Sequence, residues 1–142
     1  MTRTLVAFGL ALLVAPATPA RRQHPATGCL TYVPDTVSLK GTLRRHTFPG
    51  PPNYESIKDG DEPETGFYLH LGQPVCTIGK DEVDVAARGV RFVQLVLDST
   101  GYARLRPLLG RQVTLRGTLF HAISGHHHAP LLLTVLTPVT AQ

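Results

Sequence analysis

The chain has 142 residues, of which 14 are lysine or arginine and ten are acidic, so its formal net charge is +4 with the seven histidines neutral. Such a mild positive excess gives no strong reason to expect a polyanionic partner such as nucleic acid. The length suffices for one domain with its own hydrophobic core.

Residues 1–20 have the order of a secretory signal peptide: a single cation at Arg3, an apolar run from Leu5 to Val14, then small residues and prolines. The apolar run reaches only about half of the roughly 20 residues that cross a bilayer. We therefore expect a periplasmic or secreted protein with no membrane span in the mature chain. Cleavage after Ala17 and cleavage after Ala20 both fit the pattern.

Two cysteines, Cys29 and Cys76, lie in the predicted mature chain. An even number in an oxidising compartment predicts a mutual disulfide. The bond would tie residues 21–35, a separate amino-terminal segment, to a domain at residues 36–138. "ATGC" before Cys29 faintly resembles a lipoprotein cleavage site, and a lipid anchor there would forbid the disulfide.

Alternation of apolar and polar residues predicts the first strands in chain order. Residues 37–43, "VSLKGTL", have the period of two that is typical of a half-buried strand. Residues 48–66 contain four prolines and are predicted to be a long loop. Alternation resumes in "FYLHLGQPVCTI" at 67–78, and "VRFVQLVL" at 90–97 predicts a third strand. The outward residues Tyr68 and His70 are expected to be ordinary surface residues.

A short helix is predicted after the third strand. Asp98 and Ser99 are suitable helix starts and Gly110 is a suitable stop, while Pro107 shortens or kinks the helix. "RQVTLRGTLFHA" at 111–122 and "PLLLTVL" at 130–136 predict two further strands. The order of three strands, one helix and two strands predicts an all-β protein with one short helix, folded as a five-stranded OB-fold-like barrel.

One short sequence occurs twice, as "VSLKGTL" at 37–43 and "VTLRGTL" at 113–119. In an OB-fold the first and fourth strands are neighbours, and both bend strongly. Gly41 and Gly117 would then permit the bulge or the close approach that the bending demands. Chance similarity between two amphipathic strands is the alternative explanation.

Several motifs resemble an exported bacterial family known as domain of unknown function family 4431. They are "TFPGPPNYES", "GDEPETG", "VQLVL", "LRPLLG" and "GTLFHAISGHHHAPLLL". The resemblance extends almost from end to end of the predicted mature chain. The resemblance implies a periplasmic or secreted domain and supplies no activity.

The candidate site lies in two segments of unusual composition, residues 48–66 and 121–128. OB-folds usually bind through the loops that join strands one to two and four to five, at one mouth of the barrel. The predicted ligand-binding residues are Tyr54, Glu55, His121 and His127. The simpler alternative is that the first segment is a rigid turn with solvated acids and the second a polar, glycine-containing turn.

A transition-metal site is a sharper alternative for the histidines. Imidazole suits zinc, copper and nickel, and a carboxylate could complete the shell. In an extended segment His126 and His128 project to one face and His127 to the other, so the predicted metal ligands are His126, His128 and His121.

Three functions follow, and an exported binding module for an unknown protein or small ligand is the default. A transition-metal-binding protein is the first alternative. A metal-dependent hydrolase, with Glu55 as the base for a metal-activated water, is less favoured. Nucleic-acid binding is not favoured, because the first loop is acidic, tryptophan is absent and export separates the chain from nucleic acid.

Overall fold

The computed structural model describes residues 28–141, with side chains described to residue 136. The predicted signal peptide at 1–20 and the first part of the segment 21–35 lie outside the described residues. The strands are β1 (Thr36–Pro49), β2 (Pro63–Val75), β3 (Val90–Val96), β4 (Gln112–His121) and β5 (Leu131–Ala141), and the helix α1 spans Ser99–Leu105. Two short 3₁₀ helices span Ile57–Asp59 and Arg106–Leu108.

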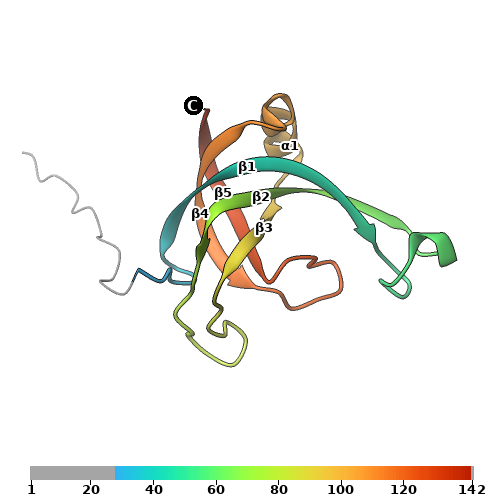
Figure 1. Cartoon of the computed structure of the whole chain (residues 1–142), viewed down its shortest axis with the longest axis horizontal. Coiled ribbons are helices and arrows are strands. Elements are labelled where there is room, and N and C mark those ends of the chain that lie inside the picture. The colour runs from blue at the N-terminus through green and yellow to red at the C-terminus, as the bar shows by residue number, and fades with distance from the viewer. Residues whose placement is uncertain (1–27, 142) are drawn as a thin grey trace, which may run out of the picture.

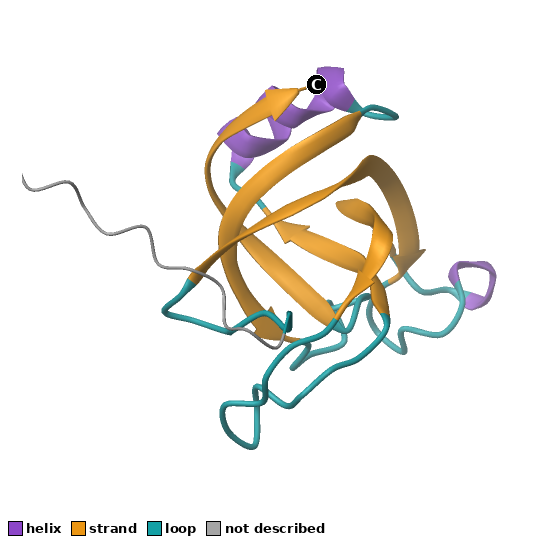
Figure 2. Cartoon of the chain, turned by 60° about the vertical axis from the view of Figure 1, so that its left-hand side comes forward, coloured by secondary structure: helices purple, strands orange, loops and turns teal. Residues whose placement is uncertain are grey.

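The five strands close into a barrel in the order β1-β2-β3-β5-β4 (Figures 1 and 2). Neighbouring strands are antiparallel except β3 and β5, which are parallel. This arrangement confirms the predicted OB-fold-like barrel with one short helix. No helix among residues 28–141 is long and apolar enough to cross a membrane.

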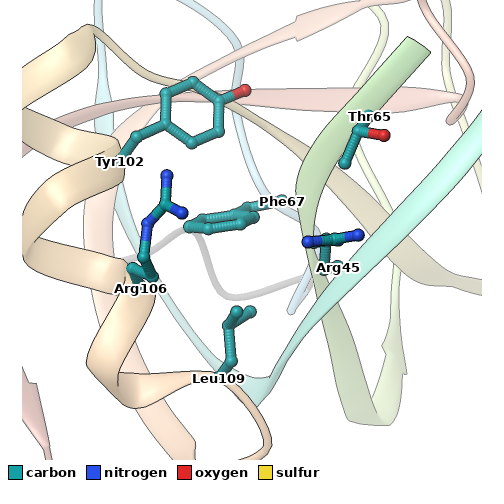
Figure 3. Close-up of a pocket in the computed structure, with 6 residues that line it drawn as sticks. All are labelled: Arg45, Thr65, Phe67, Tyr102, Arg106 and Leu109. Atoms are coloured by element: carbon teal, nitrogen blue, oxygen red, sulfur yellow. The ribbon is translucent and has the colours of Figure 1, made fainter. Parts of the chain in front are cut away.

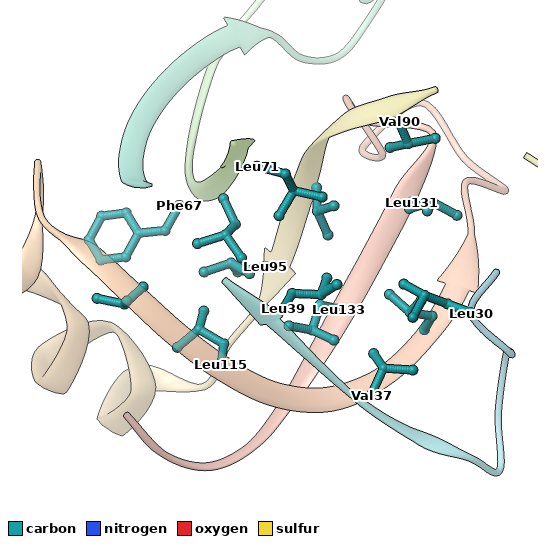
Figure 4. Close-up of a cluster of buried hydrophobic side chains, with 14 of the residues drawn as sticks. Leu30, Val37, Leu39, Phe67, Leu71, Val90, Leu95, Leu115, Leu131 and Leu133 are labelled. Atoms are coloured by element: carbon teal, nitrogen blue, oxygen red, sulfur yellow. The ribbon is translucent and has the colours of Figure 1, made fainter. Parts of the chain in front are cut away.

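The barrel interior is filled by aliphatic side chains that alternate along the strands (Figure 4). On β2 the inward residues are Phe67, Leu69 and Leu71, all buried. Leu43, Leu69, Leu119 and Leu131 have no exposed surface. The period of two that identified the strands in the sequence therefore also identified this core.

The helix begins and ends as the sequence predicts. Asp98 is the N-cap, and its carboxylate accepts a hydrogen bond from the backbone N–H of Gly101 at 2.6 Å. The α-helix ends at Leu105, and Pro107 lies in the 3₁₀ turn that follows. The side chain of Leu105 is buried in the core, while Tyr102 and Leu109 pack against it.

The repeated sequence pairs with itself. Strands β1 and β4 are antiparallel, with Leu39 opposite Leu115, Gly41 opposite Val113 and Val37 opposite Gly117. A Cβ added to Gly41 would lie 2.5 Å from the carbonyl oxygen of His70 on β2, and one added to Gly117 would overlap the carbonyl oxygen of Thr134 on β5. Each copy therefore supplies a glycine where the next strand approaches too closely for a side chain.

The predicted disulfide between Cys29 and Cys76 is present. It holds the segment before β1 against the end of β2, where the backbone of Leu30 also bonds to that of Cys76 and of Ile78. Leu30 and Tyr32 are thereby buried as part of the core, and the Tyr32 hydroxyl donates to the carbonyl of Val85 at 2.6 Å.

The loop predicted at 48–66 is shorter than expected. Strand β1 continues to Pro49 and β2 begins at Pro63, with Phe48 paired to Glu64 and Pro49 paired to Pro63. Both prolines stand at strand ends, where a missing N–H interrupts no inner ladder. The two strands therefore extend together as an arm at the right of Figure 1, and the connecting loop is residues 50–62.

Candidate functional site

Aromatic and imidazole rings cover the outer face of β1, β2 and β3. Tyr68 points outward from β2, and Phe92 of β3 stacks on it with ring centroids 4.8 Å apart. His46 and Phe48 of β1 contact the same tyrosine edge-on. Tyr68 is consequently only 1% exposed, so its interpretation as a surface residue was wrong. Burial and the nearby Tyr102 and Glu64 raise the pKa of Tyr68 to about 12.

Two histidines lie at the edge of this outer face. The Nε2 atoms of His46 and His70 are 2.9 Å apart and share a hydrogen bond, so one ring donates and the other accepts. His70 is exposed, as expected. Partial burial, the charge of His46 and that of Arg44 together lower the pKa of His70.

The loop at 50–62 is organised by one buried carboxylate. Asp61 is 5% exposed and accepts hydrogen bonds from the backbone N–H groups of Asn53, Glu55 and Ser56 at 2.7 to 2.9 Å. The bonds from Ser56 and Glu55 hold the pKa of this carboxyl below its ordinary value. This acid is therefore a structural anchor of the loop and not part of a solvated acidic surface.

Tyr54 connects this loop to the segment between β4 and β5. Its backbone is left-handed, with φ of 61°, an unusual conformation for a bulky residue. The ring lies against Gly125, where an added Cβ would be 2.9 Å from two ring carbons. The Tyr54 hydroxyl is 3.0 Å from Nε2 of His126, and the two rings meet edge to face. The absence of a side chain at Gly125 thus allows the Tyr54 ring to pack against this segment.

A carboxylate on β2 holds two of the three consecutive histidines. Glu64 Oε1 is 2.5 Å from Nδ1 of His126, and Oε2 is 2.8 Å from Nε2 of His128. The Gln94 side chain on β3 fixes the same backbone, donating to the carbonyl of His126 at 3.0 Å and accepting from the N–H of His128 at 2.7 Å. We call Tyr54, Glu64, Gln94, His126 and His128 the histidine–glutamate cluster.

The proton positions in the cluster follow from the donors and acceptors available. Desolvation alone would raise the pKa of Glu64, but hydrogen bonds and charge from His128 and His126 outweigh it, and the pKa is lowered. The ionised carboxylate only accepts, so His126 donates from Nδ1. In its neutral form His126 then accepts the Tyr54 hydroxyl proton at Nε2, which makes a continuous tyrosine–histidine–glutamate chain.

An open depression lies beside the cluster, with a volume of about 290 Å³. Its walls include Glu64, Gln94, His126 and His128, and its other lining residues are Thr65, Gly66, Tyr68 and Tyr102. The His128 ring also stacks on Phe48, with centroids 4.8 Å apart. The depression therefore offers a carboxylate, an amide and imidazoles next to the aromatic outer face.

Three of the predicted site residues do not contact the cluster. His127 turns away, and its Nδ1 accepts the backbone N–H of Ile123 at 2.9 Å. The backbone N–H of His121 donates a hydrogen bond to the Asp84 carboxylate at 3.1 Å. The His121 ring lies near the carbonyl of Ala122. The Glu55 side chain is exposed and only its backbone contacts Asp61. The acid that holds the histidines is Glu64.

Among residues 28–141, no group of three or more His, Cys, Asp or Glu side chains is arranged so that it could hold a metal ion. The ring nitrogens of His126 and His128 each contact a different oxygen of Glu64. The cluster as it stands is a hydrogen-bond network between imidazoles and a carboxylate.

Comparison with curated proteins finds no similar sequence. A protein-family model does match residues 92–137, a segment that includes α1, β4 and the histidine-containing connection to β5. Gln94, His126 and His128 lie within the match, while Tyr54 and Glu64 precede it. The resemblance noted in the sequence is thus confirmed over residues 92–137, by the model of the family described as Domain of unknown function (DUF4431).

Proposed function

We propose that this chain is an exported binding module whose ligand site lies at the barrel mouth, between residues 48–66 and 121–128. The observation that carries the proposal is that Glu64 joins the two segments beside an open depression of about 290 Å³. OB-folds commonly bind ligands with the face of strands two and three and the loops on either side of it. The ligand is a small polar molecule or a polar side chain of a protein partner.

Two features support export. The predicted signal peptide at residues 1–20 precedes the mature segment at 21–35 and the domain at 36–138. The disulfide between Cys29 and Cys76 is typical of an oxidising compartment, such as the periplasm or the exterior of the cell. A periplasmic or secreted location also separates the chain from nucleic acid.

Binding is favoured over metal-dependent hydrolysis by the contents of the cluster. Nδ1 of His126 contacts Glu64 and Nε2 contacts the Tyr54 hydroxyl, a hydrogen-bonded arrangement that a polar ligand can join. Glu55, the base considered for a metal-dependent hydrolase, does not contact the cluster.

Nuclear magnetic resonance (NMR) of the tag-free, ¹⁵N-labelled protein tests the proposal. The probes are free amino acids, mono- and disaccharides and inorganic phosphate, each added separately. The expected result is a saturable shift of the amide signals of Gln94, His126 and His128 with at least one probe class. The His126→Ala/His128→Ala double variant should lose the response, while His127→Ala should retain it. Shifts confined to other parts of the barrel, or an unchanged response in the double variant, would refute the site.

Calorimetry with zinc, copper and nickel salts separates the metal alternative from the plain binding module. A metal bound by Nδ1 of His126 and Nε2 of His128 would displace both rings from Glu64, so its affinity should be weak and should fall as the rings protonate at low pH. Dissociation constants no better than about 100 µM, or about 5.5 kcal/mol, support the plain module. Much tighter binding that disappears in the double variant would instead establish the transition-metal function.

A further inference from the structure

A second depression lies next to the first, on the side of the barrel covered by α1. Its volume is about 170 Å³, and it is lined by Arg45, Thr65, Phe67, Tyr102, Arg106 and Leu109 (Figure 3). Thr65 and Tyr102 line both depressions. The histidine–glutamate cluster does not line the second one, and no role considered so far uses it.

Two guanidinium groups flank this second depression. In Figure 3 Arg45 from β1 and Arg106 from the 3₁₀ turn after α1 lie on opposite sides of the Phe67 ring. Among the side chains of residues 28–136, neither guanidinium makes a hydrogen bond or an ion pair. Their ten N–H donors are therefore available to a ligand, since each guanidinium has about five.

The sequence segments that contain the two arginines have no acidic residues. Residues 36–54, which include Arg45, contain no aspartate or glutamate, and neither do residues 99–142, which include Arg106. The acid nearest along the chain to the lining is Glu64, and its two oxygens are engaged by His126 and His128. No acidic side chain in the described part of the chain pairs with Arg45 or Arg106 to neutralise the charge of the depression.

The floor between the arginines is apolar. Phe67 is 4% exposed, and Tyr102 packs on it edge-on with ring centroids 4.9 Å apart. Leu109 is partly buried against the same core. Arginine binds planar carboxylates and phosphates through paired N–H groups, and it also stacks on aromatic rings. An apolar floor between two such groups suits a ligand that is both anionic and partly apolar.

We propose that this second depression binds the carboxylate or phosphate of a small organic acid whose aromatic or aliphatic part lies on Phe67. The volume is below the roughly 300 to 1,000 Å³ of typical ligand pockets, so the site takes one ring or a terminal group. Arg45 and Arg106 hold the anion from two sides, and Tyr102 and Thr65 complete the lining. The site is independent of the histidine–glutamate cluster and stands whether or not that cluster binds a ligand.

The test is an NMR titration of the tag-free protein, purified from cells after any processing of its amino terminus. The probes are benzoate, phenyl phosphate, benzamide and acetate. Benzoate or phenyl phosphate should give saturable shifts at Phe67, Tyr102 and Leu109. Neutral benzamide should bind much more weakly because it has no negative charge for the arginines. The small anion acetate should also bind much more weakly because it has no ring to lie on Phe67. Arg45→Gln and Arg106→Gln should each weaken the aryl anion about tenfold or more, the usual effect of removing a charged hydrogen-bond donor.

Control variants keep the result decisive. Arg104→Gln removes an exposed arginine of α1 that does not line the depression, and it should leave affinity unchanged. The double variant Arg45→Lys/Arg106→Lys keeps the charge and should retain part of the binding that the glutamine variants lose. Equal binding of benzamide and benzoate, unchanged affinity in folded Arg45→Gln and Arg106→Gln proteins, or no saturable shift with either aryl anion would overturn the proposal.

Discussion

The two faces of strand β2 bury their side chains by different means. Leu69 points into the barrel and has no exposed surface, while its neighbour Tyr68 points outward and is 1% exposed. Closure of five strands buries the leucine. The tyrosine is covered by side chains of neighbouring strands, including the rings of Phe48 and Phe92. A barrel wall thus has an interior fixed by topology and an outer face buried by side chains alone.

The difference extends to chemistry. The interior is almost entirely aliphatic, so it specifies the fold with few polar groups to satisfy. The outer face and its border carry imidazoles, a carboxylate and an amide that hydrogen bond to one another. No buried side-chain nitrogen or oxygen in the described part of the chain lacks a hydrogen-bond partner. The outer face is therefore the part of the barrel where a ligand can compete for existing bonds.

Removal of the disulfide is expected to cause the largest loss in the free energy of unfolding. Changing Cys29 and Cys76 to serine releases a segment whose Leu30 and Tyr32 belong to the core. For cysteines 47 positions apart, the chain-entropy model gives a loss of about 4 kcal/mol in the free energy of unfolding. Urea unfolding measures the loss, and NMR should show unchanged amide signals at His126 and His128. An unchanged free energy of unfolding would contradict the role given to this bond.

Adjacent substitutions on β2 compare the faces directly. Leu69→Ala leaves a cavity in the closed interior and should lower the free energy of unfolding by about 2–5 kcal/mol. His70→Ala removes an exposed ring and one hydrogen bond to His46, and should lower it by less than about 1 kcal/mol. Urea unfolding of both variants decides the point. Similar losses for the two would show that the outer face is as important for stability as the interior.

Substitution of a close-approach glycine is expected to cause a smaller loss of stability, and a second glycine on β2 provides the control. A methyl group at Gly117 would overlap the carbonyl oxygen of Thr134, so Gly117→Ala should destabilise the barrel by about 1–3 kcal/mol. Gly72, on β2, has nothing within 4 Å of an added Cβ. Gly72→Ala should therefore stay within about 0.5 kcal/mol of the parent protein. Thermal unfolding of the pair tests whether close strand approach explains the repeated glycine.

The smallest expected effect is the contribution of the lowered His70 pKa to the pH dependence of stability. Partial burial and the charges of His46 and Arg44 lower its pKa from 6.5, so the unfolded chain binds this proton more readily than the folded one. Stability from this group accordingly falls as pH drops through 6.5. NMR of the imidazole carbons should place the His70 pKa below 6.5, and His46→Ala should move it upward. A value at or above 6.5 in the parent protein would contradict this description.

The elements were predictable because each depends on local pattern. Alternation in "VSLKGTL" and "FYLHL" located β1 and β2 together with their inward residues. Asp98, Pro107 and Gly110 located the ends of the helical segment. The repeated glycines were predictable as close-approach positions once β1 and β4 were expected to be neighbours.

The outer face was less predictable, because its contacts join side chains that are distant in sequence. The burial of Tyr68 depends on rings from β1 and β3, which no pattern within β2 indicates. Glu55 was the preferred acid because rigid prolines lie close to it in the chain, and Glu64 was assigned to the same loop at 48–66. The structure pairs Phe48 with Glu64 and so places Glu64 on the strand beside the histidines, a pairing that no pattern in residues 48–66 indicates. The position of His121 depends on Asp84, in a separate loop.

The central claim is that Glu64 joins the arm of β1 and β2 to the histidine segment, and a double-mutant cycle tests it most directly. Unfolding free energies of Glu64→Ala, His128→Ala and the combined variant should give a coupling of about 1 kcal/mol at neutral pH. Because the pKa of Glu64 is lowered from 4.5 in the folded state, this stabilisation is present above 4.5 and is lost as pH falls through the lowered value. A coupling indistinguishable from zero at neutral pH would contradict the account.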